Sequence, residues 1–266
     1  MKNIKDIIEN NYNLENIEII KNEDSTEGNV YNLTTMQKKY ILKIYNDESH
    51  AIAMNEIAEK LNCKNFYIPI ILTNANNENY TKIDNKFFMI YSFLEGKKIG
   101  EAFGNIPNEI SKKLAQELKK FHNECIELDN IKLKEISFFN NEMRRSVLHF
   151  DLTRCNIFYN ENNKMIGFID FDDAKYGESV IDVAILITNL YFSKTRGAHI
   201  EGVKTFIDEY YKNDYETKKI EVPLIKAAAI KWINYILKGN KFNASSLDSL
   251  EIRKTLIEKV NFRKLI

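Results

Sequence analysis

Two short apolar runs joined by a polar turn constrain the fold of this chain more than any other feature. The runs lie in "VLHFDLTRCNIFY" (147–159) and "GFIDFDDA" (167–174), and "NENN" (160–163) lies between them. Apolar runs separated by turn-forming residues predict a β-hairpin. Asn156 and Asp170 then fall at the same open end of the hairpin, and Asp151 lies on the loop that leads into it.

These three side chains offer two carboxylates and one amide oxygen. Mg²⁺ prefers such hard oxygen ligands and completes its shell with water and substrate phosphates. A carboxylate that stays free of metal can accept the proton of a hydroxyl group, so the set meets the needs of phosphoryl transfer. Asp and Asn also form turns at strand ends. The ordered set beside buried-looking strands nevertheless favours a functional site with Asp151, Asn156 and Asp170 at its centre.

The rest of the chain predicts an α+β fold with two lobes, residues 1–92 and residues 93–266. Five strands and one helix are expected in the first lobe; the strands are 17–21, 29–35, 39–45, 68–72 and 86–93, and the helix is 50–62. After the hairpin, apolar residues recur three or four apart almost to the end of the chain, which predicts a mainly helical second lobe.

Composition excludes several classes of protein. Lys+Arg and Asp+Glu both number 38, so a nucleic-acid binder that relies on bulk charge is not expected. No run approaches 18 apolar residues, and the first twenty residues lack the apolar core of a signal peptide. The three cysteines have no metal-binding spacing and fit a reducing compartment. We therefore expect a cytoplasmic protein that binds neither nucleic acid nor membrane.

Lys43 lies between apolar neighbours on one face of its predicted strand. It could contact phosphate oxygens in a half-covered cleft, with Glu56 or Glu59 of the following helix orienting its ammonium group. A lysine that extends along the rim of a sheet is the alternative. The turn "STEGNVY" (25–31), with Gly28 and Asn29, could place backbone N–H groups over phosphates, or it could be a plain hairpin turn.

Two further residues are expected to hold the loop that carries Asp151. His149 could donate a hydrogen bond to the backbone, and a structural role is expected for it rather than a catalytic one. Asp182 lies in the apolar stretch "VIDVAILI", where an unpaired carboxylate would be costly. We expect its donors to be backbone N–H groups of this loop or His149, although a first-turn carboxylate favoured by the helix dipole is the alternative.

Six segments in a fixed order resemble the aminoglycoside phosphotransferase and choline kinase superfamily. They are "EGNVYNL", "YILKIY", "NEIAEKL", "FFMIYSFLEGKKI", "HFDLTRCNIFY" and "GFIDFDDAKYGESVIDVA". Its members are small-molecule kinases with a protein-kinase-like fold, in which an antiparallel sheet binds the nucleotide. The resemblance covers almost the whole chain. One departure is visible, because the family often has glycine where Phe150 stands.

The resemblance implies ATP and Mg²⁺ as cofactors and a role for each candidate residue. Asp151 would be the base that orients the hydroxyl, Asn156 and Asp170 would hold the metal, and His149 and Asp182 would hold the loop. The nucleotide-binding residues would be Lys43, Glu56, Gly28, Asn29, Ser92, Phe93 and Leu94.

The predicted activity is transfer of the γ-phosphate to a hydroxyl of a small acceptor, such as an amino alcohol, a sugar or an aminoglycoside-like compound. A nucleotide-binding pseudokinase, or a scaffold like the spore-coat members of the superfamily, is the alternative. A protein kinase is not expected, since about a dozen residues separate Asp170 from the next helix. The chain is expected to act as a monomer or homodimer.

Overall fold

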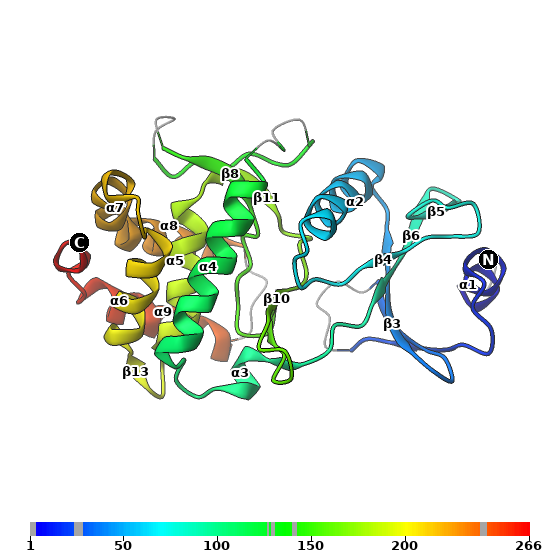
Figure 1. Cartoon of the computed structure of the whole chain (residues 1–266), viewed down its shortest axis with the longest axis horizontal. Coiled ribbons are helices and arrows are strands. Elements are labelled where there is room, and N and C mark those ends of the chain that lie inside the picture. Colours follow the sequence, from blue (N-terminus) through cyan, green and yellow to red (C-terminus); the bar gives the residue numbers. More distant parts are fainter. Residues whose placement is uncertain (1–3, 24–28, 127, 129–130, 140–142, 240–243) are drawn as a thin grey trace. The chain divides into compact units, whose positions relative to one another are not determined.

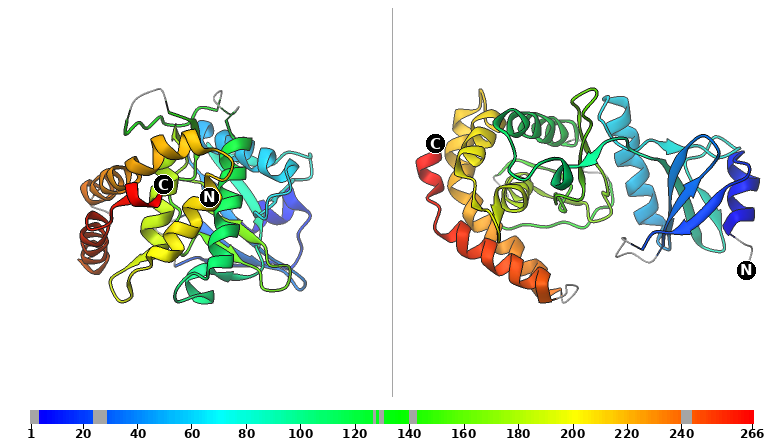
Figure 2. Two further views of the ribbon diagram at one scale, coloured as in Figure 1. Left: turned by 60° about the vertical axis from the view of Figure 1, so that its left-hand side comes forward. Right: turned by 90° about the horizontal axis from the view of Figure 1, so that it is seen from below.

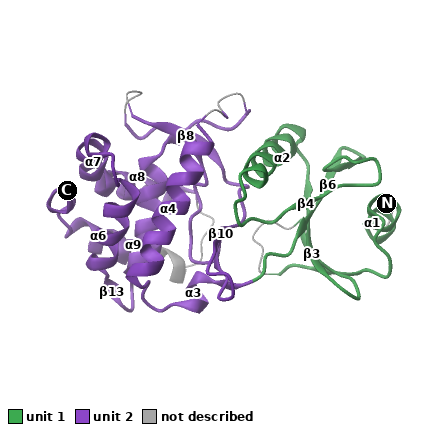
Figure 3. Cartoon of the chain, viewed as in Figure 1, with its two compact units in different colours: residues 1–95 green, residues 96–266 purple. Residues whose placement is uncertain are grey.

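The computed structural model describes the chain except residues 1–3, 24–28, 127, 129–130, 140–142 and 240–243. Gly28 therefore lies outside the described residues. The chain divides into two compact units, Met1–Glu95 and Gly96–Ile266 (Figure 3). The division falls three residues after the predicted boundary, and the functions assigned to the two lobes stay predictions.

Unit 1 contains an antiparallel sheet with the strand order β1-β2-β3-β6-β4, and β5 also pairs with β6. The strands are β1 (Glu18–Lys21), β2 (Val30–Thr34), β3 (Lys39–Tyr45), β4 (Ile71–Leu72), β5 (Thr81–Ile83) and β6 (Lys86–Ser92). The described residues thus form six strands where five were expected. The additional strand, β5, has three residues, which is too short for a visible period-two pattern.

Two helices cover the sheet of unit 1, whereas one was predicted. The predicted helix is α2 (Glu48–Cys63), and the side chain of Asp47 accepts a hydrogen bond from the backbone of His50 at its N-terminus. The additional helix is α1 (Ile4–Tyr12), which is interrupted by charges and shows only a narrow apolar stripe. The two helices lie on opposite sides of the sheet (Figures 1 and 2).

The core between α1 and the sheet determines which way the strand side chains point. Ile8 and Tyr12 pack with Leu42 and Ile44 of β3, and the Tyr12 hydroxyl donates a 2.6 Å hydrogen bond to the carbonyl of Phe88. Because side chains alternate along a strand, Lys43 points to the opposite face of the sheet, the face that α2 covers.

Unit 2 is mainly helical, as predicted. Its helices are α3 (Ile99–Ala102), α4 (Asn108–Glu124), α5 (Val180–Tyr191), α6 (Ile200–Tyr210), α7 (Tyr215–Glu221), α8 (Ile225–Lys238) and α9 (Ala244–Glu258), with 3-10 turns at Val222–Leu224 and Phe262–Leu265. Every residue of α5 is buried, and α5 packs against α6 and α8. None of the helices in the described part of the chain combines the length and the apolar composition that crossing a bilayer requires.

Short strands link the helices of unit 2. They are β7 (Lys97–Lys98), β8 (Arg145–Leu148), β9 (Ile157–Tyr159), β10 (Ile166–Phe168), β11 (Lys175–Glu178), β12 (Phe192–Ser193) and β13 (Gly197–Ala198). The predicted hairpin is β9–β10, and the side chain of Asn160 accepts hydrogen bonds from backbone N–H groups within its turn. β8 pairs with β11, so the loop between β8 and β9 begins and ends on paired strands.

Candidate active site

The loop between β8 and β9, residues 149–156, carries the predicted base. Two backbone hydrogen bonds shape it: the N–H of Thr153 donates to the carbonyl of Asp151 at 2.8 Å, and the N–H of Asn156 donates to the carbonyl of Thr153 at 3.2 Å. Nδ2 of Asn156 lies 2.7 Å from Oδ2 of Asp151 and 3.1 Å from its carbonyl oxygen. These contacts hold the carboxylate of Asp151 and occupy the amide nitrogen of Asn156, so the amide oxygen is the atom with which Asn156 could bind a metal ion.

The register of the hairpin places Asp170 beside Asn156, as expected from the sequence. Phe168 pairs with Ile157, and the N–H of Ile169 donates a 3.0 Å hydrogen bond to the carbonyl of Asn156. Asp170 follows directly, is exposed, and has a φ of 67°. The left-handed backbone ends the strand at this point, which turns Asp170 out of the ladder at the open end of the hairpin.

Negative charge surrounds the carboxylate of Asp151. Burial raises the pKa of Asp151, and the negative charges of Asp173 and Asp170 raise it further. His149 and the hydrogen bond from Asn156 act in the opposite direction. A bound cation would reduce this repulsion between carboxylates.

The donor set fits Mg²⁺. In the described residues, no group of three or more His, Cys, Asp and Glu side chains could hold a metal ion, so a metal that needs a complete protein shell has no site there. Mg²⁺ needs only one or two protein oxygens and takes the remaining ligands from water and substrate phosphates. Asn156 and Asp170 would provide those two oxygens.

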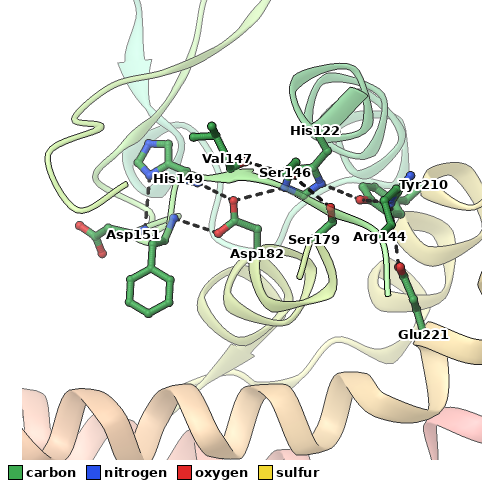
Figure 4. A network of polar contacts seen from close by, with 11 residues as sticks. His122, Arg144, Ser146, Val147, His149, Asp151, Ser179, Asp182, Tyr210 and Glu221 are labelled. Carbon is green, nitrogen blue, oxygen red and sulfur yellow. Dashed lines mark hydrogen bonds and ion pairs between the residues drawn. The ribbon is translucent and has the colours of Figure 1, made fainter. Parts of the chain in front are cut away.

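Asp182 and His149 hold the loop in the way expected from their positions in the sequence (Figure 4). The backbone N–H groups of His149 and Phe150 donate to the carboxylate of Asp182 at 2.7 and 2.9 Å. Nε2 of His149 lies 2.9 Å from the carbonyl oxygen of Ile169, to which it donates. The two hydrogen bonds to Asp182 connect the loop to α5, and the hydrogen bond from His149 connects it to the hairpin that carries Asp170.

Phe150 has a backbone conformation that favours glycine. Its φ is 65°, a left-handed conformation that glycine adopts without steric cost. The phenylalanine is retained here because its ring is buried, packs edge-on against Tyr235 at 5.5 Å, and has Nζ of Lys175 above its face. The two hydrogen bonds to Asp182 keep this backbone conformation in place.

A buried polar network extends from Asp182 into the helices (Figure 4). Nε2 of His122 lies 3.3 Å from Asp182, and its Nδ1 lies 2.6 Å from the hydroxyl of Tyr210. That hydroxyl also contacts Arg144, which lies 3.9 Å from Glu221. Burial lowers the pKa of His122, so we take its ring as neutral.

Among the residues that extend this network beyond Asp182, only His122 could be singled out from the sequence. His122 lies in the last turn of an amphipathic helix next to Phe121, a position that is typical of a histidine with hydrogen-bond partners in the core. Nothing in the sequence singles out Tyr210 or Arg144, because both lie among other aromatic and basic residues. Their contact joins positions 66 residues apart.

The candidate nucleotide-binding residues that the structure describes all lie in unit 1. Lys43 is half-buried on the sheet face that α2 covers, and Glu56 is exposed on α2. Glu59 accepts a hydrogen bond from Asn79, which favours Glu56 as the partner of Lys43.

The predicted hinge residues continue from the end of β6. Ser92 exchanges two hydrogen bonds with the backbone of Ile70, Phe93 is exposed, and Leu94 is buried. Asn29 lies directly before β2 and is exposed. The roles of these residues stay predictions.

Residues 127–216 match the model of the phosphotransferase enzyme family. This region contains the loop, the hairpin, α5 and α6. No curated protein matches the chain in sequence.

Solved structures share the fold over nearly the whole chain. A structure of the amicoumacin kinase hAmiN with AMP-PNP, Ca²⁺ and Ami is 16% identical, has a TM-score of 0.71, and covers 99% of this chain and 96% of its own. A microcompartment-associated aminopropanol kinase is 11% identical, with a TM-score of 0.67 and 96% of each chain covered. The choline kinase LicA from Streptococcus pneumoniae is 14% identical, with a TM-score of 0.60 and coverages of 97% and 98%.

The match over the loop and hairpin and the shared fold agree with the resemblance seen in the sequence. The family model thus matches the region that carries the loop and the hairpin, and the chain has the protein-kinase-like fold of the small-molecule kinases to which it is similar.

Proposed function

We propose that this protein is an ATP- and Mg²⁺-dependent kinase that transfers the γ-phosphate to a hydroxyl group of a small molecule. The observation that supports this most directly is the carboxylate of Asp151, held at 2.7 Å by Asn156 at the open end of the hairpin that bears Asp170. A fixed base beside two oxygen ligands is the arrangement that phosphoryl transfer to an alcohol needs.

In this proposal, Asp151 orients the acceptor hydroxyl and accepts its proton as the oxygen attacks the γ-phosphorus. Asn156 and Asp170 hold Mg²⁺, which when bound neutralises charge on the phosphates. His149 and Asp182 do not touch the reacting atoms. They keep the loop in the conformation that points Asp151 at the hydroxyl.

The nucleotide would be held by residues of unit 1. Lys43, oriented by Glu56, would contact the α- and β-phosphates, and the backbone at Gly28 and Asn29 would cover them. Ser92, Phe93 and Leu94 would lie beside the adenine. The sheet face shared by Lys43 and α2 supports the pairing of Lys43 with Glu56.

The acceptor is proposed to be an amino alcohol, a sugar or an aminoglycoside-like compound. We place the enzyme in the cytoplasm, as a monomer or homodimer. Cys63, Cys125 and Cys155 are free thiols, which is compatible with a reducing compartment.

The test is ADP release from Mg·ATP with a panel of small hydroxyl acceptors, comparing the wild type with Asp151→Asn. The amide cannot take the proton, so turnover should fall at least about a hundredfold while Mg·ATP binding, followed by calorimetry, stays near the wild-type value.

The control is Asp208→Asn, a change of the same charge at a surface ion pair with Lys218 on α7; it should keep full activity. Retained turnover in Asp151→Asn would refute the role of Asp151. Mg·ATP binding without turnover across the panel would identify a nucleotide-binding protein without catalysis.

A further inference from the structure

Three arginines from distant parts of the sequence approach one another at the C-terminal end of α5. Arg154 belongs to the loop that carries Asp151, Arg196 lies in the turn between β12 and β13, and Arg253 lies on α9. Nη1 of Arg154 donates to the carbonyl of Leu190 at 3.3 Å. Nη1 of Arg253 lies 2.7 Å from Oδ1 of Asn189, so both guanidinium groups are fixed at adjacent residues of one helix.

The fold brings Arg196 to the same place. β12 follows α5 directly, and α9 packs against both β12 and β13. The electrostatics agree with this placement: burial lowers the pKa of Arg154, and the charges of Arg196 and Arg253 lower it further, while burial and then the charge of Arg196 lower the pKa of Arg253.

No carboxylate opposes these charges in the described part of the chain. Arg154 donates to the carbonyls of Leu190, Phe103 and Gly104, and Arg253 donates to an amide oxygen. Among the described residues, none of the three arginines takes part in an ion pair. Three like charges held together without a counter-charge are unfavourable unless a ligand supplies one.

The cluster also has hydrogen-bond donors to offer. Nε of Arg253 is buried and has no hydrogen-bond partner, an arrangement that usually indicates a missing acceptor. Arg196 is exposed at the tip of its hairpin. Arg154 uses its Nη atoms on the backbone and contributes mainly charge, so the free donors belong to Arg196 and Arg253.

We propose that Arg154, Arg196 and Arg253 form a binding site for an oxyanion, a carboxylate or a phosphate group. Guanidinium groups present paired N–H donors that match the two oxygens of such a group. Asn189, which contacts Arg253, also donates a 3.2 Å hydrogen bond to the carbonyl of Leu152, next to Asp151. The oxyanion therefore lies against the same loop as the proposed base.

A position beside Asp151 would bring the oxyanion close to the acceptor, and this part of the inference rests on the proposed function. An oxyanion at this site is either part of the acceptor, which would then carry a carboxylate or phosphate besides its hydroxyl, or free phosphate that acts as an effector. In both cases three positive charges beside the loop disfavour polycationic acceptors such as aminoglycosides.

The first experiment measures binding of inorganic phosphate by calorimetry, with the full chain saturated with Mg·AMP-PNP so that the nucleotide site is filled. Arg196→Gln removes an exposed charge and should leave the fold intact. It should weaken phosphate binding about tenfold, which corresponds to about 1.4 kcal/mol. The matched control is Lys194→Gln, an exposed lysine of the same turn, which should bind phosphate like the wild type. Equal phosphate binding by both variants, or no binding at millimolar phosphate, would overturn the site.

The second experiment identifies the source of the oxyanion. Paired acceptors, each with and without a carboxylate, are compared in Arg196→Gln and Lys194→Gln. A KM that rises about tenfold only for the carboxylate-bearing member, and only in Arg196→Gln, assigns the oxyanion to the acceptor. Phosphate that alters turnover of every acceptor without competing with it assigns the site to an effector. Phosphate binding that depends on Arg196 in a protein without turnover would preserve this site and reject the proposed kinase activity.

Discussion

The hydroxyl oxygen of Tyr210 lies 2.6 Å from Nδ1 of His122 and also 2.6 Å from Nη2 of Arg144. Because a guanidinium group can only donate, the hydroxyl of Tyr210 accepts a hydrogen bond from Arg144 and donates its own hydrogen bond to Nδ1 of His122. The proton of the neutral imidazole is then on Nε2, which faces Asp182. Each member of this chain of hydrogen bonds therefore donates to the next, from Arg144 through Tyr210 and His122 to the carboxylate of Asp182.

Asp182→Asn is expected to lower both stability and turnover. The amide puts N–H donors where the carboxylate now accepts from His149, Phe150 and His122, so at least one buried donor loses its acceptor. We expect a loss of about 3 kcal/mol in the free energy of unfolding, measured by denaturant titration, and a kcat at least tenfold lower with little change in the KM for ATP. Asp208→Asn is again the control. Wild-type kcat in Asp182→Asn would show that the loop does not depend on this carboxylate.

Tyr210→Phe is expected to remove the hydrogen bonds through which the Tyr210 hydroxyl links His122 to Arg144. The substitution keeps the ring stacked on Phe206 but leaves Nδ1 of His122 buried without a donor. The free energy of unfolding should fall by about 1–3 kcal/mol, and kcat should fall while the KM for ATP stays unchanged. Tyr235→Phe removes an exposed hydroxyl and should be neutral. Equal stabilities of the two variants would argue against the network.

His122 makes stability depend on pH in a definite direction. Burial lowers its pKa in the folded state, while the unfolded histidine keeps an ordinary pKa of about 6.5. Below about pH 6.5 the unfolded state therefore binds a proton that the folded state does not, so stability falls as pH decreases, by at most about 1.4 kcal/mol per pH unit from this group. Denaturant titrations between pH 5 and 8 should show this slope reduced in His122→Asn. Parallel pH profiles would contradict the neutral, buried imidazole.

Phe150 offers a test of backbone strain against packing. Removing the buried ring should destabilise both Phe150→Gly and Phe150→Ala by a few kcal/mol. At a φ of 65°, however, the glycine variant should be more stable than the alanine variant by about 1 kcal/mol. This order is the reverse of that expected at an ordinary position. Thermal denaturation of the two variants measures it, and a more stable alanine variant would show that the loop has another backbone conformation.

The parts of the site that are local in sequence could be predicted. The β9–β10 hairpin spans few residues, and its turn chemistry and strand pattern together place Asn156 beside Asp170. The donors of Asp182 could be expected because a carboxylate in an apolar helix must be satisfied. The position of Lys43 on the face opposite Leu42 and Ile44 followed from strand alternation alone.

The remainder depends on contacts between distant residues, which no local pattern encodes. His122 and Tyr210 are 88 positions apart, and the three arginines come together only through the packing of α9 on β12 and β13. In unit 1, α1 was missed because its charges interrupt the apolar stripe, although Ile7, Ile8 and Tyr12 are buried against the sheet. Tertiary packing, not intrinsic propensity, stabilises so short a helix.

Asn156 holds Asp151 within the loop, and His149 ties the loop to the hairpin at Ile169. In the proposed function, these two hydrogen bonds would hold Asp151, Asn156 and Asp170 at one spacing, whatever the size of the acceptor. A different acceptor would then be accommodated by the helices and turns that surround the loop, while these three side chains keep their arrangement.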